Sequence, residues 1–175
     1  MDIRSVEPFD PEQVEKAVGG VYRFTMRGSP VLQQGAWTRG LAVADNLWVH
    51  GKVYAEGGEN ALHQHLEEDH GFFVIEGGAT FSLEDGSTIE VGPYDGIMIP
   101  KGAFYRFEAK PGQNLVFIRF GGGPAGLEMA MATAPASRNY ADGTKFEAVG
   151  PRDGAHGQDL IVTGRRWTET APDGI

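Results

Sequence analysis

The fold is decided by residues 57–77, which read GGENALHQHLEEDHGFFVIEG. This stretch holds three of the five histidines of the chain, His63, His65 and His70, between apolar flanks that predict strands. On a strand, side chains two residues apart lie on one face, so His63 and His65 point the same way. On a helix they would lie about 200° apart and could not chelate one ion.

The position of His70 requires a break in the strand. An unbroken strand would turn this side chain away from the face that carries His65. The polar run of residues 66–69 suits a turn or a change of strand at that point. The acidic residues of this run are interpreted as a solvated turn, with Asp69 as an alternative ligand. Three imidazoles that converge, with water at an open position, would form a divalent metal site.

This pattern resembles the first motif of the cupin superfamily, in which Gly, His-x-His, Glu and a second Gly follow at set spacings. Here Gly57, His63, His65 and Gly77 match that motif, and His70 lies where the family usually has Glu. The resemblance implies one divalent transition metal ion per chain (Fe, Zn, Mn or Ni), with His63, His65 and His70 as its ligands. A neutral three-His set leaves the ion its full charge, which suits the polarisation of an anionic substrate oxygen.

The second cupin motif is changed in this chain. Residues 94–109, YDGIMIPKGAFYRFEA, resemble it through Pro100 and Gly102. Tyr94 replaces the Gly of the family, Tyr105 falls on its His and Ala109 on its Asn. In a barrel strand, Tyr105 is either a packing residue or, at this position, a fourth ligand, a hydrogen-bond donor near the metal or a catalytic acid or base. We take it as the candidate catalytic residue.

The resemblance covers residues 46–120 and implies an all-β fold, a cupin-type jelly-roll β-barrel. The strand and turn pattern of this region agrees with it. A short N-terminal helix is expected from Asp10, followed by a strand at 21–26 and a loop at 29–45. The expected organisation is an N-terminal helix, strand and arm (1–45), a barrel core (46–121) and a long C-terminal arm (122–175). The expected strands of the core and arm are 47–54, 72–75, 79–83, 88–91, 96–100, 104–108, 115–120 and 160–163.

Composition limits the classes of partner. The chain has 175 residues, with 15 basic against 24 acidic residues and a net charge of −9. This balance argues against a nucleic-acid or anionic-membrane partner. The chain has no cysteine and no apolar membrane-spanning run, and its first residues lack a signal-peptide pattern, so a cytoplasmic protein is expected. Apolar residues in the arm and the edge strands of the barrel predict a homodimer.

The favoured function is a metal-dependent cupin enzyme that acts on a small organic molecule, such as an aromatic or diketone-like one. Among cupin activities we favour an Fe(II) dioxygenase, because several cupin enzymes have three-His sites. The alternatives are a metal-dependent lyase, isomerase or cyclase without redox chemistry, and a non-catalytic small-molecule-binding cupin, which the changed second motif supports. Apolar residues are expected to line the barrel interior around the metal: Phe72, Val74, Met98, Phe104 and Phe107.

Overall fold

The computed structural model describes residues 6–7, 21–44, 46–55, 62–122, 138–140 and 161–166. For residues 6–7, 138–140 and 161–166, the backbone alone is described. Within these ranges the regular structure is β-strand, and no helix there is long and apolar enough to cross a membrane. The strands are β1 (Val6–Glu7), β2 (Pro30–Gln34), β3 (Ala36–Ala44), β4 (Leu47–Tyr54), β5 (His63–His65), β6 (Asp69–Glu76), β7 (Ala79–Leu83), β8 (Thr88–Val91), β9 (Gly96–Ile99), β10 (Tyr105–Ala109), β11 (Leu115–Gly122), β12 (Arg138–Tyr140) and β13 (Ile161–Arg166).

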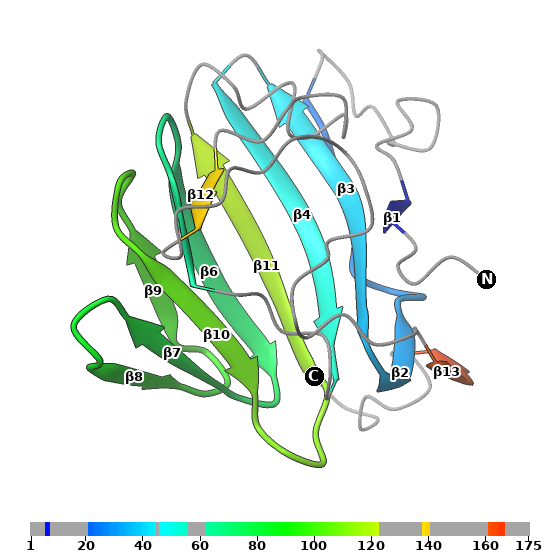
Figure 1. The fold of residues 1–175 in the computed structure, drawn as a ribbon. Helices are drawn as coiled ribbons and strands as arrows, with labels where there is room; N and C mark the ends of the chain where they lie inside the picture. The colour runs from blue at the N-terminus through cyan, green and yellow to red at the C-terminus, as the bar shows by residue number, and fades with distance from the viewer. Residues whose placement is uncertain are drawn as a thin grey trace.

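Two large sheets face each other in the molecule (Figure 1). One has the strand order β1-β3-β4-β11-β6-β9, and the other has the order β12-β5-β10-β7-β8. Strands β2 and β13 form a separate pair, and the parallel pairing of β1 with β3 is the exception among antiparallel pairs. The all-β prediction is confirmed, and the arrangement is consistent with a cupin jelly roll.

The alternation of side chains along the strands creates two apolar layers. Between the two sheets lies a cluster rich in aromatic rings, which includes Tyr54, Phe72, Phe81, Phe107 and Phe117. A second cluster covers the other face of the six-stranded sheet and contains Met26, Leu32, Trp37, Leu41, Val53, Ala55 and Val116. Adjacent residues such as Val116 and Phe117 belong to different clusters because successive side chains on a strand point to opposite faces.

Strand β11 sets the register around the candidate site. It pairs with β4 on one side and β6 on the other, so Gly121 lies opposite both Trp48 and His70. A Cβ atom at Gly121 would lie 2.2 Å from Trp48 Cζ2 and 3.0 Å from His70 Cδ2. Glycine is therefore required here, because any larger residue would displace the two rings that pack beside the site.

The predicted strands from residue 47 to residue 122 are confirmed, with small shifts at their ends. The prediction of a strand at 21–26 is wrong, because this segment forms only an isolated bridge at Tyr22, and Val21 and Phe24 are exposed. The prediction of a loop at 29–45 is also wrong, because β3 pairs along β4 and buries Trp37 and Leu41. The predicted N-terminal helix and most of the predicted C-terminal arm lie outside the described residues.

The turn before β9 shows how the chain accommodates the change at the start of the second motif. Tyr94, which stands where the cupin motif has Gly, has a φ angle of 71°, in the left-handed region that favours glycine. Its N–H donates a 2.9 Å hydrogen bond to the carbonyl of Val74, and Val74 N–H donates to the carbonyl of Asp95 at 3.0 Å. The neighbouring strand therefore holds Tyr94 in this conformation.

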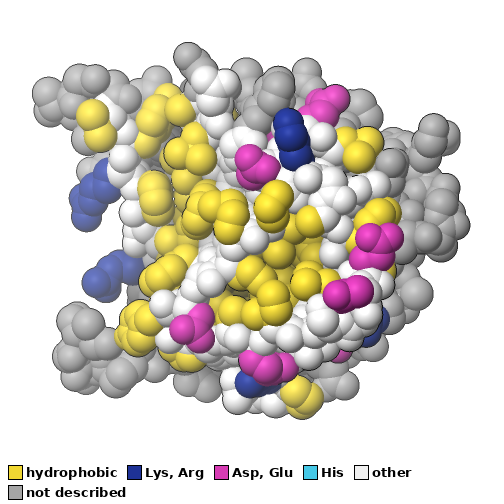
Figure 2. Space-filling model, turned by 90° about the vertical axis from the view of Figure 1, so that its left-hand side faces the viewer, with side chains coloured by type: hydrophobic (Ala, Val, Ile, Leu, Met, Phe, Trp, Pro, Cys, Tyr) yellow, Lys and Arg dark blue, Asp and Glu magenta, His cyan; other side chains and the backbone are white. Residues whose placement is uncertain are grey.

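The side of the molecule that carries β7, β8 and β9 shows a broad area of hydrophobic side chains with acidic ones around it (Figure 2). Exposed apolar residues of this region include Ile89, Tyr94 and Met98. Met98 was expected to line the barrel interior, and this prediction is wrong because its side chain is 60 % exposed. It lies opposite Gly71 in the β6–β9 pair, on the outward face of the sheet.

Candidate metal centre

His63 and His65 lie on β5, and both side chains are buried while Gln64 between them is partly exposed. This confirms that the two imidazoles share the inner face of a strand. Their ring centroids are 5.1 Å apart. Strand β5 pairs with β10, where Tyr105 lies opposite His63, and with β12 on its other edge.

The chain turns at residues 66–68 and enters β6 at Asp69, which brings His70 back beside His65. The two imidazole centroids are 3.9 Å apart. The predicted break between these histidines is therefore confirmed.

Glu68 is the residue that the sequence analysis missed. The interpretation of the acidic run as a solvated turn holds for Glu67 and Asp69, which are exposed, but it is wrong for Glu68, which is 1 % exposed. Glu68 directly precedes β6 and stands two residues before His70. The rule that placed His63 and His65 on one face therefore also places Glu68 with His70.

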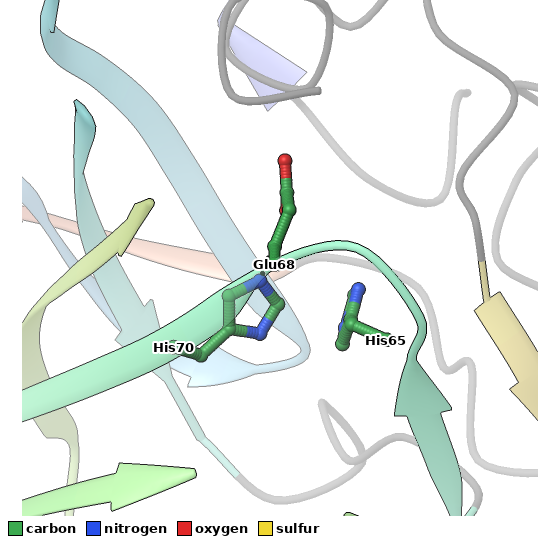
Figure 3. A group of neighbouring side chains, drawn as sticks. All are labelled: His65, Glu68 and His70. Atoms are coloured by element: carbon green, nitrogen blue, oxygen red, sulfur yellow. Dashed lines mark hydrogen bonds and ion pairs between the residues drawn. The ribbon is translucent and has the colours of Figure 1, made fainter. Parts of the chain in front are cut away.

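His65, Glu68 and His70 lie close together in the interior (Figure 3). Each residue offers one ligand atom, and these atoms all lie within 4.8 Å of one another. Two imidazoles and a carboxylate are donors that Zn²⁺, Fe²⁺ and related ions accept. The side chains present thus fit a divalent metal ion, which could bind after small adjustments. His63 is outside this group, and its role as a ligand stays a prediction.

Hydrogen bonds orient the ring of His70. Its Nε2 atom lies 3.1 Å from Glu68 Oε2, and its Nδ1 atom lies 3.2 Å from the hydroxyl oxygen of Tyr105. The two ring nitrogens therefore contact different partners, the carboxylate of Glu68 on one side and the phenol of Tyr105 on the other.

Tyr105 lies at the centre, as the second motif predicts. It is 2 % exposed, and its ring centroid lies 4.7 Å from that of His63 and 6.3 Å from that of His65. Its hydroxyl contacts His70 while its ring packs on Phe72 and Phe81. The structure therefore brings Tyr105 together with all three predicted histidines, and its catalytic role stays a prediction.

A buried cation is the second feature that the sequence analysis missed. Arg119 of β11 is 4 % exposed, and its Nη2 atom lies 2.8 Å from Nδ1 and 3.0 Å from Nε2 of His70. The same atom lies 3.5 Å from His65 Nε2. Similar distances to both ring nitrogens place the guanidinium against the imidazole as a whole. A signal was present in the sequence, since Leu115, Phe117 and Arg119 alternate onto one face of the strand.

The comparison with protein families agrees with the motif. The family model described as "Cupin domain" matches residues 52–119, which span β4 to β11. The chain therefore carries a cupin domain over these residues. No curated protein matches the sequence significantly.

Several solved structures are similar to this chain in fold. KdgF from Halomonas sp. has 19 % identity and a TM-score of 0.47, with 51 % of this chain and 79 % of that chain covered. A cupin-like protein from Thermotoga maritima has 20 % identity and a TM-score of 0.49, with 60 % and 84 % covered. A conserved protein with a double-stranded β-helix domain from Klebsiella pneumoniae has 14 % identity and a TM-score of 0.48, with 77 % and 91 % covered.

Proposed function

We propose that the protein is a metal-dependent cupin enzyme that acts on a small organic molecule. The observation that carries this proposal is the buried convergence of His65, Glu68 and His70 within 4.8 Å, with the Tyr105 hydroxyl against His70. A carboxylate and imidazoles buried together are costly unless they bind a partner such as a metal ion. Buried clusters of metal-ligating side chains are candidates for functional sites.

Among the reactions considered from the sequence, we favour an Fe(II)-dependent dioxygenase. Two histidines and one carboxylate with open positions are the donor set of non-haem Fe(II) oxygenases, and this supports the choice. The ion would supply the site at which substrate oxygen and O₂ meet. The alternative is Lewis-acid chemistry with Zn²⁺, Ni²⁺ or Mn²⁺ in a lyase, isomerase or cyclase.

The side chains around the ion would orient its ligands, move a proton and exclude water. Glu68 orients the ring of His70, and the hydroxyl of Tyr105 is placed to hold or donate a proton beside the reacting atoms. Phe72 and Phe107 are buried in the aromatic cluster between the sheets, where they exclude water and suit an apolar or aromatic substrate.

The first test is elemental analysis of protein purified without added metal. We expect a divalent transition metal at near one ion per chain, which His65→Ala should remove. Gln64→Ala is the matched control, because Gln64 is the neighbouring residue on the opposite face of β5. Metal content unchanged in His65→Ala would contradict the proposed centre.

The second test separates the classes of function. Turnover of aromatic, β-diketone and hydroxy-acid substrates is measured with Fe(II), with and without O₂. Oxygen-dependent turnover supports the dioxygenase, and turnover with Zn²⁺ in the absence of O₂ supports a lyase, isomerase or cyclase. Binding without turnover under every condition would favour the non-catalytic cupin, which the Tyr at the second-motif His position also suggests.

A further inference from the structure

A buried guanidinium lies in the cupin interior where the neighbouring positions are apolar. The inward-facing residues before Arg119 on its strand are Leu115 and Phe117, both in the aromatic cluster between the sheets. Burial of a charge that a hydrophobic residue could replace is rarely a gain in stability. Arg119 therefore calls for an explanation beyond packing.

The guanidinium is held firmly beside the metal-binding triad. Its carbon lies 4.9 Å from the ring centroid of Trp48 and 5.8 Å from that of Phe72, so two aromatic rings contact the cation. One terminal nitrogen contacts His70 and lies 3.5 Å from His65 Nε2. Its charge therefore acts directly on any group bound at the centre.

Among the described residues, Arg119 is buried together with the charged side chains of Lys52 and Glu68. Its guanidinium contributes a positive charge beside the triad, which favours an anionic ligand there. A divalent ion on the triad would raise this positive charge further in an interior of low dielectric constant. A ligand that carries a negative oxygen would lower the energy of both the ion and Arg119.

A second observation, on the indole ring of Trp48, agrees with an anionic ligand. The indole N–H of Trp48 is buried and has no hydrogen-bond acceptor among the residues that the structure describes. Buried indole N–H groups usually have one. An oxyanion bound beside the guanidinium that Trp48 contacts would offer such an acceptor.

We propose that Arg119 is the anion-binding residue of the centre and that the substrate class is a small organic carboxylate. The planar fork of a guanidinium matches a carboxylate with two parallel hydrogen bonds. The aromatic surroundings suit the apolar part of such a molecule. This inference rests on the proposed function, because it places the carboxylate of the substrate next to the metal.

The test is isothermal titration calorimetry on the full chain, first with Zn²⁺ and then with two pairs of probes. Benzoate is compared with benzamide, and acetate with acetamide, because each amide has nearly the shape of its carboxylate but no charge. Probe binding is measured on Zn²⁺-loaded protein and on protein kept in EDTA. We expect at least one carboxylate to bind 10-fold or more tightly than its amide to the loaded protein. Equal binding within both pairs overturns the proposal.

Variants assign the effect to one residue. Arg119→Gln should lower carboxylate affinity to that of the amide, and Arg119→Lys, which keeps the charge without the fork, should retain part of it. Arg106→Gln is the matched control, since Arg106 is more than one-third exposed and pairs with Glu108 at the surface. Carboxylate affinity that is unchanged in Arg119→Gln overturns the proposal. Should that variant fail to fold by circular dichroism, the wild-type probe pairs and Arg119→Lys still decide.

The two proposals fail in different ways. Absence of a saturable Zn²⁺ titration would contradict the metal-dependent enzyme. Carboxylate selectivity that persists in EDTA and vanishes in Arg119→Gln would then still support the anion site. A normal Zn²⁺ titration without carboxylate selectivity would contradict the anion site alone. Inorganic phosphate serves as a further probe, and tighter binding of phosphate than of both carboxylates would overturn the assigned substrate class.

Discussion

Replacement of Glu68 by glutamine is the sharpest test of which residues form the centre. The side chain of Glu68 is fully buried, and its Oε2 atom lies within hydrogen-bond distance, 3.1 Å, of His70 Nε2. Glutamine has nearly the same volume and keeps an acceptor oxygen, but it loses the negative charge. Glu68→Gln therefore removes a metal ligand and a charged acceptor while it leaves the packing in place.

The expected losses follow from these contacts. A hydrogen bond to a charged group contributes about 1.5–3 kcal/mol and a neutral one about 0.5–1.5, so the fold should lose about 1 kcal/mol. For a chain of this length, that corresponds to a fall of about 2–4 °C in Tm. Groups that only orient a ligand change metal affinity by about 10–100-fold, so loss of a ligand itself should lower Zn²⁺ affinity by about 100-fold or more.

The assay is Zn²⁺ titration by calorimetry, with thermal unfolding of the metal-free protein alongside. Glu67→Gln is the control, because it makes the same chemical change at the adjacent, exposed position. Zn²⁺ affinity that is equal in the two variants would refute the assignment of Glu68 as a ligand. That outcome would favour the set predicted from the sequence, His63, His65 and His70.

Three further predictions concern other residues. Gly121→Ala should cost about 1–3 kcal/mol and weaken Zn²⁺ binding although no ligand is replaced, because its Cβ would lie 2.2 Å from Trp48 Cζ2 and 3.0 Å from His70 Cδ2. An unchanged midpoint of urea unfolding would contradict this. Tyr105→Phe should retain metal and fold but lower turnover by about 100-fold, and unchanged turnover would return Tyr105 to a packing role. The pKa of Glu90 lies below its ordinary value because Lys110 and then Thr80 hydrogen-bond to the carboxylate. Its folded-state pKa is below the unfolded value, so its contribution to stability is present above pH 4.5 and is lost as the pH falls through the lowered pKa. The Tm difference between wild type and Glu90→Gln should shrink over that acidic range, and a difference that stays constant with pH would exclude this origin.

The assembly of the chain stays a proposal. We propose a homodimer, as the edge strands indicate, and β9 is such an edge in the six-stranded sheet. Its exposed Met98 and the exposed Phe73 of β6 lie on the outward face of this edge. Light scattering at micromolar concentration should give twice the mass of the chain, and a monomer would count against the proposal.

The sequence predicted those strands that are bounded by local turn residues or show an alternating pattern of their own. The hairpin between β7 and β8 is an example, because Asp85, Gly86 and Ser87 form the turn locally: Gly86 has a φ angle of 82° and Asp85 accepts two hydrogen bonds from Ser87. The segment 29–45 has no such local signal. Its strand β3 exists because of its long pairing with β4, which a reading of neighbouring residues does not detect.

The sequence predicted the histidines and Tyr105 of the candidate site, but it did not predict the buried charged residues beside them. Gly57, the His-x-His pair and Gly77 indicate the position of the centre through their resemblance to the first cupin motif. Glu68 is the middle one of three consecutive acidic residues, and the outer two are exposed to solvent, so the sequence did not distinguish it from them. Arg119 was hidden in an apolar strand, and its proximity to His70 arises from the β11–β6 register, which joins segments about fifty residues apart.

The short strand β5, which carries His63 and His65, pairs with a strand that comes much later in the sequence. Strand β5 is paired with β10 at one position only, His63 with Tyr105. All three residues of β5 are paired with β12, at Arg138–Tyr140. During synthesis, the histidines of β5 therefore leave the ribosome long before the strand that completes their pairing. A fragment that ends at residue 122 would contain His65, Glu68 and His70, yet the strand that carries His63 and His65 would have one edge without its partner.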